Sequence, residues 1–341
     1  MIDLDSTLAD VQSSERYPVG TLKMDDPTAK VRLSHSTNSL LRGCERKFQK
    51  TKLLHNPLPR ENTPATVFGK AYGAAAQHYM VLRTMGETVQ TAMDSSIYEA
   101  YLSYSPALED DRRFMERVIY CIQAAQGFHE QQLMEWEIAE LGGRFAAEMS
   151  FRIDIDDKYY YVGYLDLVLK NRRNGRYAVT DYKSTSMRGE DLSPNYKFSD
   201  QVLGYTMVLD AAAGKELSEF DTNFWICQLP SSGISSIYQP KFKAYTFPKT
   251  LKDRFEWFLK LYLDVNYLET LSNLDVYPRR ASHCTSYNKT CHFFNECQYT
   301  ESDKPGIYEE DKTEYQFNYK LEDLFKDHQE RLSIIQTASR R

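Results

Sequence analysis

Three charged residues near the middle of the chain have the types and spacing that metal chemistry needs. Asp166 lies in one apolar segment, and Asp181 and Lys183 lie in the next, with Asn-Gly at 174–175 between them. Asn-Gly is the strongest short signal for a β-hairpin, because both central residues of a type I′ turn need positive φ. A two-residue turn places Asp166 opposite Lys183 and on the same face as Asp181, since side chains alternate between faces along a strand.

Two carboxylates and an ammonium on one face of an apolar hairpin indicate a site for a divalent cation. Burying these groups without partners is costly, so their presence on such a surface needs a reason. A structural ion pair is the alternative interpretation, and such pairs contribute little to stability once desolvation is counted. We therefore expect a metal site at this hairpin.

The pattern of one aspartate followed about fifteen residues later by Asp-x-Lys resembles the PD-(D/E)XK nuclease superfamily. Gln201 and Tyr205 follow on a predicted helix, four residues apart and so on one face. This pair is similar to the Q-x-x-x-Y motif of the RecB-like and Cas4-like branches, where the two residues contact DNA or brace the site. An ordinary amphipathic helix is the alternative for this segment, but it does not predict this order after Lys183.

Two further residues take a role only from this resemblance. His78 lies on the small, apolar face of a predicted helix that begins near Phe68, and it is similar to the metal-binding histidine of the G-x-x-x-H helix. A buried core histidine is the alternative. Glu148 lies in a predicted strand where related enzymes carry a supporting glutamate, or it faces solvent. The resemblance also implies that the Tyr182 carbonyl helps to hold the catalytic metal.

Three clustered cysteines near the end of the chain form a second strong signal. Cys284, Cys291 and Cys297 lie in a loop-like stretch without the paired C-x-x-C knuckles of most zinc sites. In Cas4-like and AddB-like nucleases a distant upstream cysteine completes such a set, and Cys44 stands at that position. The resemblance thus implies a structural [4Fe-4S] cluster. The wide gap between Cys284 and Cys291 departs from the family spacing and leaves zinc as an alternative, with His283 or His292 as a substitute ligand.

The net charge of −6 gives the chain no overall attraction to nucleic acid, so a DNA-binding protein of this composition needs a local basic surface. Basic residues close to Cys44 and to the cysteine cluster provide a candidate rim for a DNA strand. They are Arg42, Arg46, Lys47, Arg279 and Arg280.

The resemblance implies an α/β fold whose core is a mixed sheet flanked by helices. We expect a flexible arm over residues 1–30, a nuclease domain over 31–300 and a charged tail over 301–341. A helical subdomain is predicted over 87–141, and the cysteine cluster at 284–297 closes the domain.

The resemblance implies a nuclease that uses Mg²⁺ or Mn²⁺ to hydrolyse phosphodiester bonds at free or single-stranded DNA ends. A helicase, recombinase or replication protein is a candidate partner for the tail. The alternatives are a DNA-binding scaffold without hydrolysis and a zinc-stabilised interaction module. No apolar run is long enough to cross a bilayer and the N-terminus lacks a secretory pattern, so we expect a cytoplasmic protein of a bacterium or a phage-infected host.

Overall fold

A computed structural model describes residues 30–55, 63–106, 109–110, 113–187, 190–214, 217, 219–229, 239–286, 289–298 and 311–338. Apart from Lys30, the predicted flexible arm lies outside the described residues. The chain divides into two compact units. The larger unit contains residues 61–151, 164–257 and 327–341, and the smaller contains 1–60, 152–163 and 258–326.

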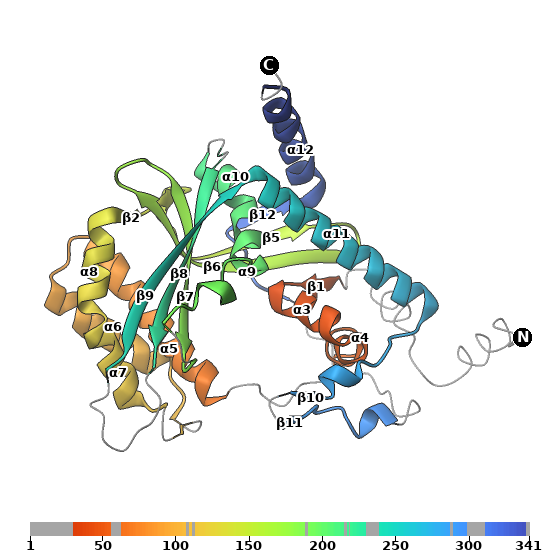
Figure 1. The fold of residues 1–341 in the computed structure, drawn as a ribbon, viewed down its shortest axis with the longest axis horizontal. Coiled ribbons are helices and arrows are strands. Elements are labelled where there is room, and N and C mark those ends of the chain that lie inside the picture. The colour runs from red at the N-terminus through yellow and green to blue at the C-terminus, as the bar shows by residue number, and fades with distance from the viewer. Residues whose placement is uncertain are drawn as a thin grey trace, which may run out of the picture. The chain divides into compact units, whose positions relative to one another are not determined.

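The sheet of the larger unit is built from four neighbouring strands (Figure 1). They are β6 (Tyr159–Asn171), β7 (Tyr177–Thr185), β8 (Glu219–Gln228) and β9 (Lys241–Thr250). Strands β6 and β7 are antiparallel, β7 and β8 are parallel, and β8 and β9 are antiparallel. The short strand β2 (Trp136–Ile138) pairs with the end of β6. This mixed sheet confirms the predicted α/β class.

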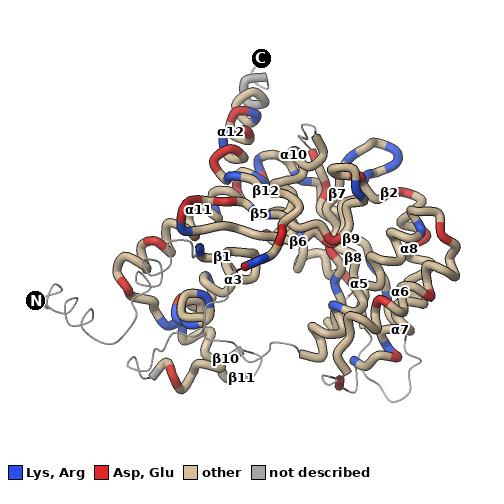
Figure 2. The backbone as a smooth tube through the Cα atoms, turned by 180° about the vertical axis from the view of Figure 1, so that it is seen from behind, with Lys and Arg blue, Asp and Glu red and all other residues tan. Residues whose placement is uncertain are grey.

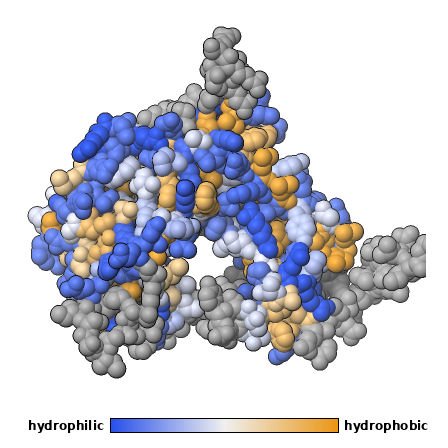
Figure 3. Space-filling view, in the orientation of Figure 1, coloured by the Kyte–Doolittle hydropathy of each residue, from blue (hydrophilic) through white to orange (hydrophobic). Residues whose placement is uncertain are grey.

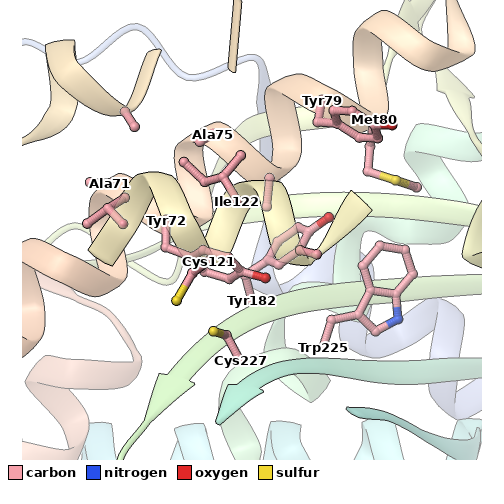
Figure 4. Packing of buried hydrophobic residues seen from close by; sticks show 14 of the residues in the cluster. Ala71, Tyr72, Ala75, Tyr79, Met80, Cys121, Ile122, Tyr182, Trp225 and Cys227 are labelled. Atoms are coloured by element: carbon pink, nitrogen blue, oxygen red, sulfur yellow. The ribbon is translucent and has the colours of Figure 1, made fainter. Parts of the chain in front are cut away.

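Helices cover the face of this sheet that carries Tyr182 and Trp225. They are α5 (Pro64–Thr84), α6 (Val89–Ser103), α7 (Met115–Ala124) and α8 (Gln126–Glu135). Small residues such as Ala75 let α5 approach the strands, and Figure 4 shows Tyr72 of α5 and Cys121 of α7 packed around Tyr182. The predicted helical segment 87–141 is thus helical over most of its length, and it ends in β2 and the strand pair β3 (Glu140–Leu141) and β4 (Arg144–Phe145).

The opposite face of the same sheet carries a short helical run after β7. The 3₁₀ turn η3 (Ser193–Asn195) precedes α9 (Asp200–Tyr205), the 3₁₀ turn η4 (Thr206–Val208) and α10 (Leu209–Ala213). Gly204 of α9 lies against Trp257 of α11 (Leu251–Leu274), and a Cβ at position 204 would lie 2.7 Å from the indole nitrogen. Only glycine allows this approach, so it fixes where α9 lies.

The smaller unit begins with β1 (Val31–Leu33), which pairs in parallel with the first residues of β6. Helix α3 (His35–Gly43) follows, and Ser34 caps it in a capping box with Thr37. Next come α4 (Glu45–Phe48) and the π-helical turn η1 (Gln49–Leu53), and the later part of α11 also belongs to this unit. The cysteine-bearing segment consists of the 3₁₀ turns η5 (Ala281–His283) and η6 (Glu296–Gln298) and the hairpin of β10 (Thr285–Ser286) and β11 (Lys289–Thr290).

Part of the segment predicted as a charged tail is built into the fold. Strand β12 (Phe317–Lys320) pairs with β5 (Ala147–Asp154), and α12 (Leu321–Ala338) follows it. Within the larger unit, Arg331 of α12 and Arg254 both pair with Asp210, the latter at 2.7 Å. Both guanidinium groups are buried. Of the described helices, none is long and apolar enough to cross a membrane. On the face drawn in Figure 3, hydrophilic and hydrophobic residues are mixed over the described part of the chain.

Candidate active site

The hairpin that carries the charged residues has a wider turn than the sequence predicted. The strand pairing runs from Lys170 opposite Tyr177 to Leu167 opposite Thr180, so the next residues, Asp166 and Asp181, face each other. The prediction of Asp166 opposite Lys183 was therefore wrong by two residues.

The cause lies in Asn171, whose side-chain oxygen accepts hydrogen bonds from the amides of Arg173 and Asn174 and begins the turn earlier. The Gly175 amide then donates to the Asn171 carbonyl, which closes the loop. A register shift of two residues leaves every side chain on its predicted face, whereas a shift of one would have reversed them all. Asp166, Asp181 and Lys183 therefore still lie on one face of the hairpin, as predicted.

Asp166 and Asp181 form a pair of facing carboxylates, of which Asp181 is buried and Asp166 is half-buried. Asp166 Oδ2 accepts a hydrogen bond from the Tyr182 amide at 2.9 Å, and Asp181 Oδ2 lies 2.7 Å from Lys183 Nζ. Burial and the charge of Asp181 raise the pKa of Asp166 to about 7, and burial also raises the pKa of Asp181 against the opposing effect of Lys183. Two carboxylates that resist ionisation together are poised to gain from a bound cation.

Lys183 is connected to helix α9 by a chain of hydrogen bonds. Its Nζ donates to Gln201 Oε1 at 3.0 Å, and Gln201 Nε2 donates to Tyr205 Oη at 3.2 Å. The ring of Tyr205 packs edge-on against Phe151 of β5 at 6.0 Å, and burial raises the pKa of Tyr205 to about 12. Of the predicted Q-x-x-x-Y pair, Gln201 thus contacts Lys183 directly and Tyr205 is connected to it through Gln201.

Glu148 lies near this cluster on β5. Its charge contributes to the raised pKa of Asp166, and its backbone has a φ of 50°, which is uncommon for a residue with a Cβ. The side chain is exposed. Backbone strain of this kind concentrates at functional sites, so Glu148 joins the candidate site.

The structure does not bring His78 to the carboxylates. Helix α5 packs on the Tyr182 face of β7, as the 3.8 Å separation between Tyr182 Cβ and a Cβ built at Gly73 shows, whereas Asp181 and Lys183 point to the other face. The His78 ring hydrogen-bonds Ser95 of α6 at 2.8 Å instead. The helical pattern identified the apolar helix correctly, but it could not tell which face of the sheet that helix covers.

The donor set at the hairpin suits a hard divalent cation. Across the described ranges, no group of three or more His, Cys, Asp and Glu side chains is close enough together to hold a metal ion as it stands. Two facing carboxylates with a third nearby nonetheless supply the oxygen ligands that Mg²⁺ and Mn²⁺ prefer. The Tyr182 amide donates a hydrogen bond to Asp166. This bond fixes the backbone at Tyr182, whose carbonyl was predicted to be a metal ligand.

The four predicted cluster cysteines lie in the smaller unit, and three of them are electrostatic neighbours. Burial raises the pKa of the Cys297 thiol, and the charges of Cys291 and Cys44 raise it further. The Cys291 amide donates to the Cys284 carbonyl at 2.7 Å, so the fourth residue adjoins the group. All four are free and half-buried, whereas Cys121 and Cys227 are core residues of the larger unit. As the structure stands, no three of these thiols are close enough together to hold a metal ion.

His283 also lies at this cluster. A Cβ built at Gly43, next to Cys44, would lie 3.2 Å from the imidazole of His283. The alternative of zinc with a histidine ligand therefore keeps a candidate residue. His292 is exposed and packs edge-on against Phe293.

Two residues of the predicted basic rim are neutralised within the smaller unit. Arg42 makes two hydrogen bonds to Asp264 at 2.9 and 2.7 Å, and Arg280 pairs with the buried carboxylate of Glu45. The charge of Arg280 contributes to lowering the pKa of Glu45 to about 2. The rim was predicted from basic residues that are close in sequence, and this pattern does not reveal acidic partners from distant segments.

The other members of the rim differ from one another. Arg46 is buried and bonds Gln49, so it is not available at the surface, whereas Lys47 is half-buried and Arg279 is exposed. Figure 2 shows the basic character of α4 along the chain trace. The proposed DNA contact at this rim therefore reduces to Lys47 and Arg279.

One residue at the site was missed by the sequence analysis. Tyr196 stacks on Phe224 at 4.9 Å, and the charge of Asp181 contributes to its raised pKa. Phe224 pairs directly with Asp181 across β7 and β8. The available signal was an aromatic residue between Asp-x-Lys and Gln201, but only the strand pairing shows that it lies beside the carboxylates.

Comparison with known proteins identifies the family. No curated protein sequence matches the chain. The crystal structure of a proposed exonuclease from Eubacterium rectale is similar, with 11% identity and a TM-score of 0.43, over 85% of this chain and 93% of that one. The sequence model of the PD-(D/E)XK nuclease superfamily matches residues 32–299, which include every candidate site residue. The chain belongs to the PD-(D/E)XK nuclease superfamily.

Proposed function

We propose that the protein is a metal-dependent DNA nuclease, and more specifically a Cas4-like or RecB-like exonuclease that acts at DNA ends. The observation that carries the proposal is that Asp181 pairs with Lys183, which is hydrogen-bonded to Gln201 and through it to Tyr205, while Asp166 lies on the neighbouring strand. A structural ion pair accounts for Asp181 and Lys183, but it does not account for a second carboxylate, Asp166, that faces the first.

Asp166 and Asp181 would hold Mg²⁺ or Mn²⁺, with Glu148 and the Tyr182 carbonyl as further oxygen donors. A bound divalent cation supplies an acidified water and neutralises charge that develops on the phosphate. The carboxylates must be ionised to hold it, and their raised pKa values make this step depend on pH.

Lys183 provides the positive charge that orients the attacking water and stabilises the pentavalent phosphate. Gln201 holds the ammonium through its Oε1 atom, and Tyr205 fixes the orientation of the amide from the other side. Burial of Tyr205 keeps its hydroxyl protonated, so it remains a neutral partner throughout the reaction.

The cysteines of the smaller unit would hold a structural [4Fe-4S] cluster. Cys44 would supply one ligand from the start of α4, and Cys284, Cys291 and Cys297 would supply the others. Burial raises the pKa of Cys297, and the charges of Lys50 and Arg46 oppose this rise without reversing it. Zinc, with His283 in place of one thiolate, is the alternative occupant.

Digestion of end-labelled DNA tests the proposed activity. Linear and circular DNA, single- and double-stranded, should be incubated with Mg²⁺ or Mn²⁺, with Lys183→Ala as the matched variant. We expect the wild type to degrade linear DNA from its ends and the variant to lose at least 100-fold in rate, as for loss of a positioned acid–base group. Cleavage of closed circles at the same rate would contradict the exonuclease assignment, and equal cleavage by the variant would contradict the site.

A further inference from the structure

Edge strand β9 carries a stripe of basic and aromatic residues on the same face of the sheet as the catalytic carboxylates. Its register with β8 and β7 aligns Tyr245 with Phe224 and Asp181, and Lys243 with Ile226 and Lys183. Side chains alternate along a strand. The residues on this face of β9 are Lys241, Lys243, Tyr245, Phe247 and Lys249.

This stripe holds the chain segment 190–199, which connects β7 to α9. The Leu192 amide donates to Tyr245 Oη at 2.9 Å, and Lys249 Nζ donates to the Lys197 carbonyl at 2.8 Å. Lys243 Nζ donates to the Glu190 carbonyl. Three side chains of one strand thus fix the segment along the sheet edge.

The fixed segment presents an aromatic ring to solvent. Phe198 is 79% exposed, although it is large and apolar. Lys197 Nζ lies 5.5 Å from the centre of the ring, and Lys249 Nζ lies 6.0 Å from it. A single exposed apolar residue is common on protein surfaces, but a ring bordered by two ammonium groups on a fixed backbone is a different feature.

The segment leads directly to the candidate active site. Tyr196, two residues before Phe198, stacks on Phe224, which pairs with Asp181. Gln201, three residues after Phe198, accepts a hydrogen bond from Lys183. Phe198 therefore lies in the chain between two residues, Tyr196 and Gln201, that contact the candidate site.

We propose that Phe198, with Lys197 and Lys249 beside it, is a stacking platform for an unpaired nucleobase of the DNA strand that enters the active site. An exposed aromatic ring binds bases regardless of sequence, because every base has a π-face, and the exposed ammonium of Lys197 attracts the phosphates. Lys249 is buried and holds the backbone beneath the ring. A paired base inside a duplex has both of its faces covered by neighbouring bases. The platform therefore selects single-stranded or frayed ends, and this inference rests on the proposed nuclease function.

Binding of labelled oligothymidine in EDTA, followed by fluorescence anisotropy, tests the platform without cleavage. We expect Phe198→Ala to weaken binding about 5- to 100-fold, the loss of one stacked base, and Phe198→Trp to retain it. Lys197→Ala should lower the slope of log Kd against log salt concentration by about 0.7. Tyr98→Ala is the matched control, since Tyr98 is 64% exposed on α6 of the same unit.

The outcomes separate this inference from the proposed function. If the wild type binds and cleaves DNA but Phe198→Ala binds oligothymidine as tightly, the platform is refuted and the nuclease stands. Equal weakening for blunt duplex and for oligothymidine also refutes base stacking. A wild type that neither binds nor cleaves DNA refutes the proposed function itself. Thermal melting of Phe198→Ala, whose side chain is exposed, checks that the fold is intact.

Discussion

Lys183 donates a hydrogen bond to Gln201 across 3.0 Å, and this contact joins strand β7 to helix α9. The two residues are eighteen positions apart, and the hydrogen bond from Gln201 to Tyr205 makes α9 a rigid support for the ammonium. The position of the Lys183 ammonium therefore depends on how α9 is held.

Gln201→Ala is expected to reduce cleavage about tenfold, because loss of one hydrogen bond to a charged group costs about 1.5 kcal/mol or more. Single-turnover kinetics on labelled DNA measures this loss. The effect should fall on the rate at saturating DNA rather than on binding. Gln123→Ala, at an exposed position of α7, is the control and should cleave normally. Equal rates for the two variants would show that Gln201 does not position Lys183.

The facing carboxylates predict an unusual dependence of stability on pH in the absence of metal. Burial and the charge of Asp181 raise the pKa of Asp166 to about 7, so between about pH 4 and pH 7 the folded state binds more protons than the unfolded state. The free energy of unfolding therefore falls as pH rises through this range. We expect Asp166→Asn to be more stable than the wild type at pH 8, by about 1–3 kcal/mol, and to show no such gain at pH 4.

Thermal melts of both proteins at pH 4 and pH 8, with EDTA or with Mg²⁺, measure this difference. Added Mg²⁺ should stabilise the wild type at pH 8 and have little effect on Asp166→Asn. The idea fails if the two proteins lose stability in parallel as the pH rises.

Gly204→Ala is expected to displace α9. The new Cβ would lie 2.7 Å from Trp257 Nε1, and the indole is buried and cannot move away freely. Overpacking of this kind costs about 1–3 kcal/mol. Cleavage should fall together with stability, as measured by denaturant unfolding and DNA digestion. The control is Gly127→Ala on α8, where a Cβ meets nothing within 4 Å. If Gly204→Ala is as active and stable as this control, α9 is not fixed by Trp257.

The sequence predicted correctly that the three charged residues share a face, because the face on which a strand residue lies depends only on whether the spacing is odd or even. Asp166, Asp181 and Lys183 share a face in either register, so an error of two residues in the turn did no harm. The turn itself was misread because Asn171 forms side-chain hydrogen bonds that the Asn-Gly signal does not reveal.

Contacts between distant segments could not be predicted from local patterns. Arg42 was assigned to a DNA-binding rim, but Asp264 neutralises it from a helix more than two hundred residues away. His78 was assigned to the metal on the strength of a motif, and the packing of α5 places it on the other side of the sheet. The stripe of β9 had a visible alternation, but its meaning depends on the strand pairing that brings it beside Asp181.

The cysteine proposal predicts a coloured protein. Protein purified without oxygen should be brown and contain about four iron atoms per chain. Cys297→Ser should lose most of the iron, whereas Cys121→Ala should keep it, since Cys121 lies in the core of the larger unit. Visible absorption and metal analysis decide the matter. A colourless protein with one zinc per chain would favour the zinc alternative, and equal iron in the two variants would exclude these cysteines as ligands.

The most direct test of the whole account is the rate of DNA cleavage by Asp181→Asn, which keeps the shape of the side chain and removes its charge. The account predicts that Mg²⁺- or Mn²⁺-dependent cleavage falls to background while affinity for DNA, measured by anisotropy in EDTA, stays within a few-fold of the wild type. Cleavage at the wild-type rate by a pure preparation of this variant would contradict the claim that Asp181 and its neighbours form the active site.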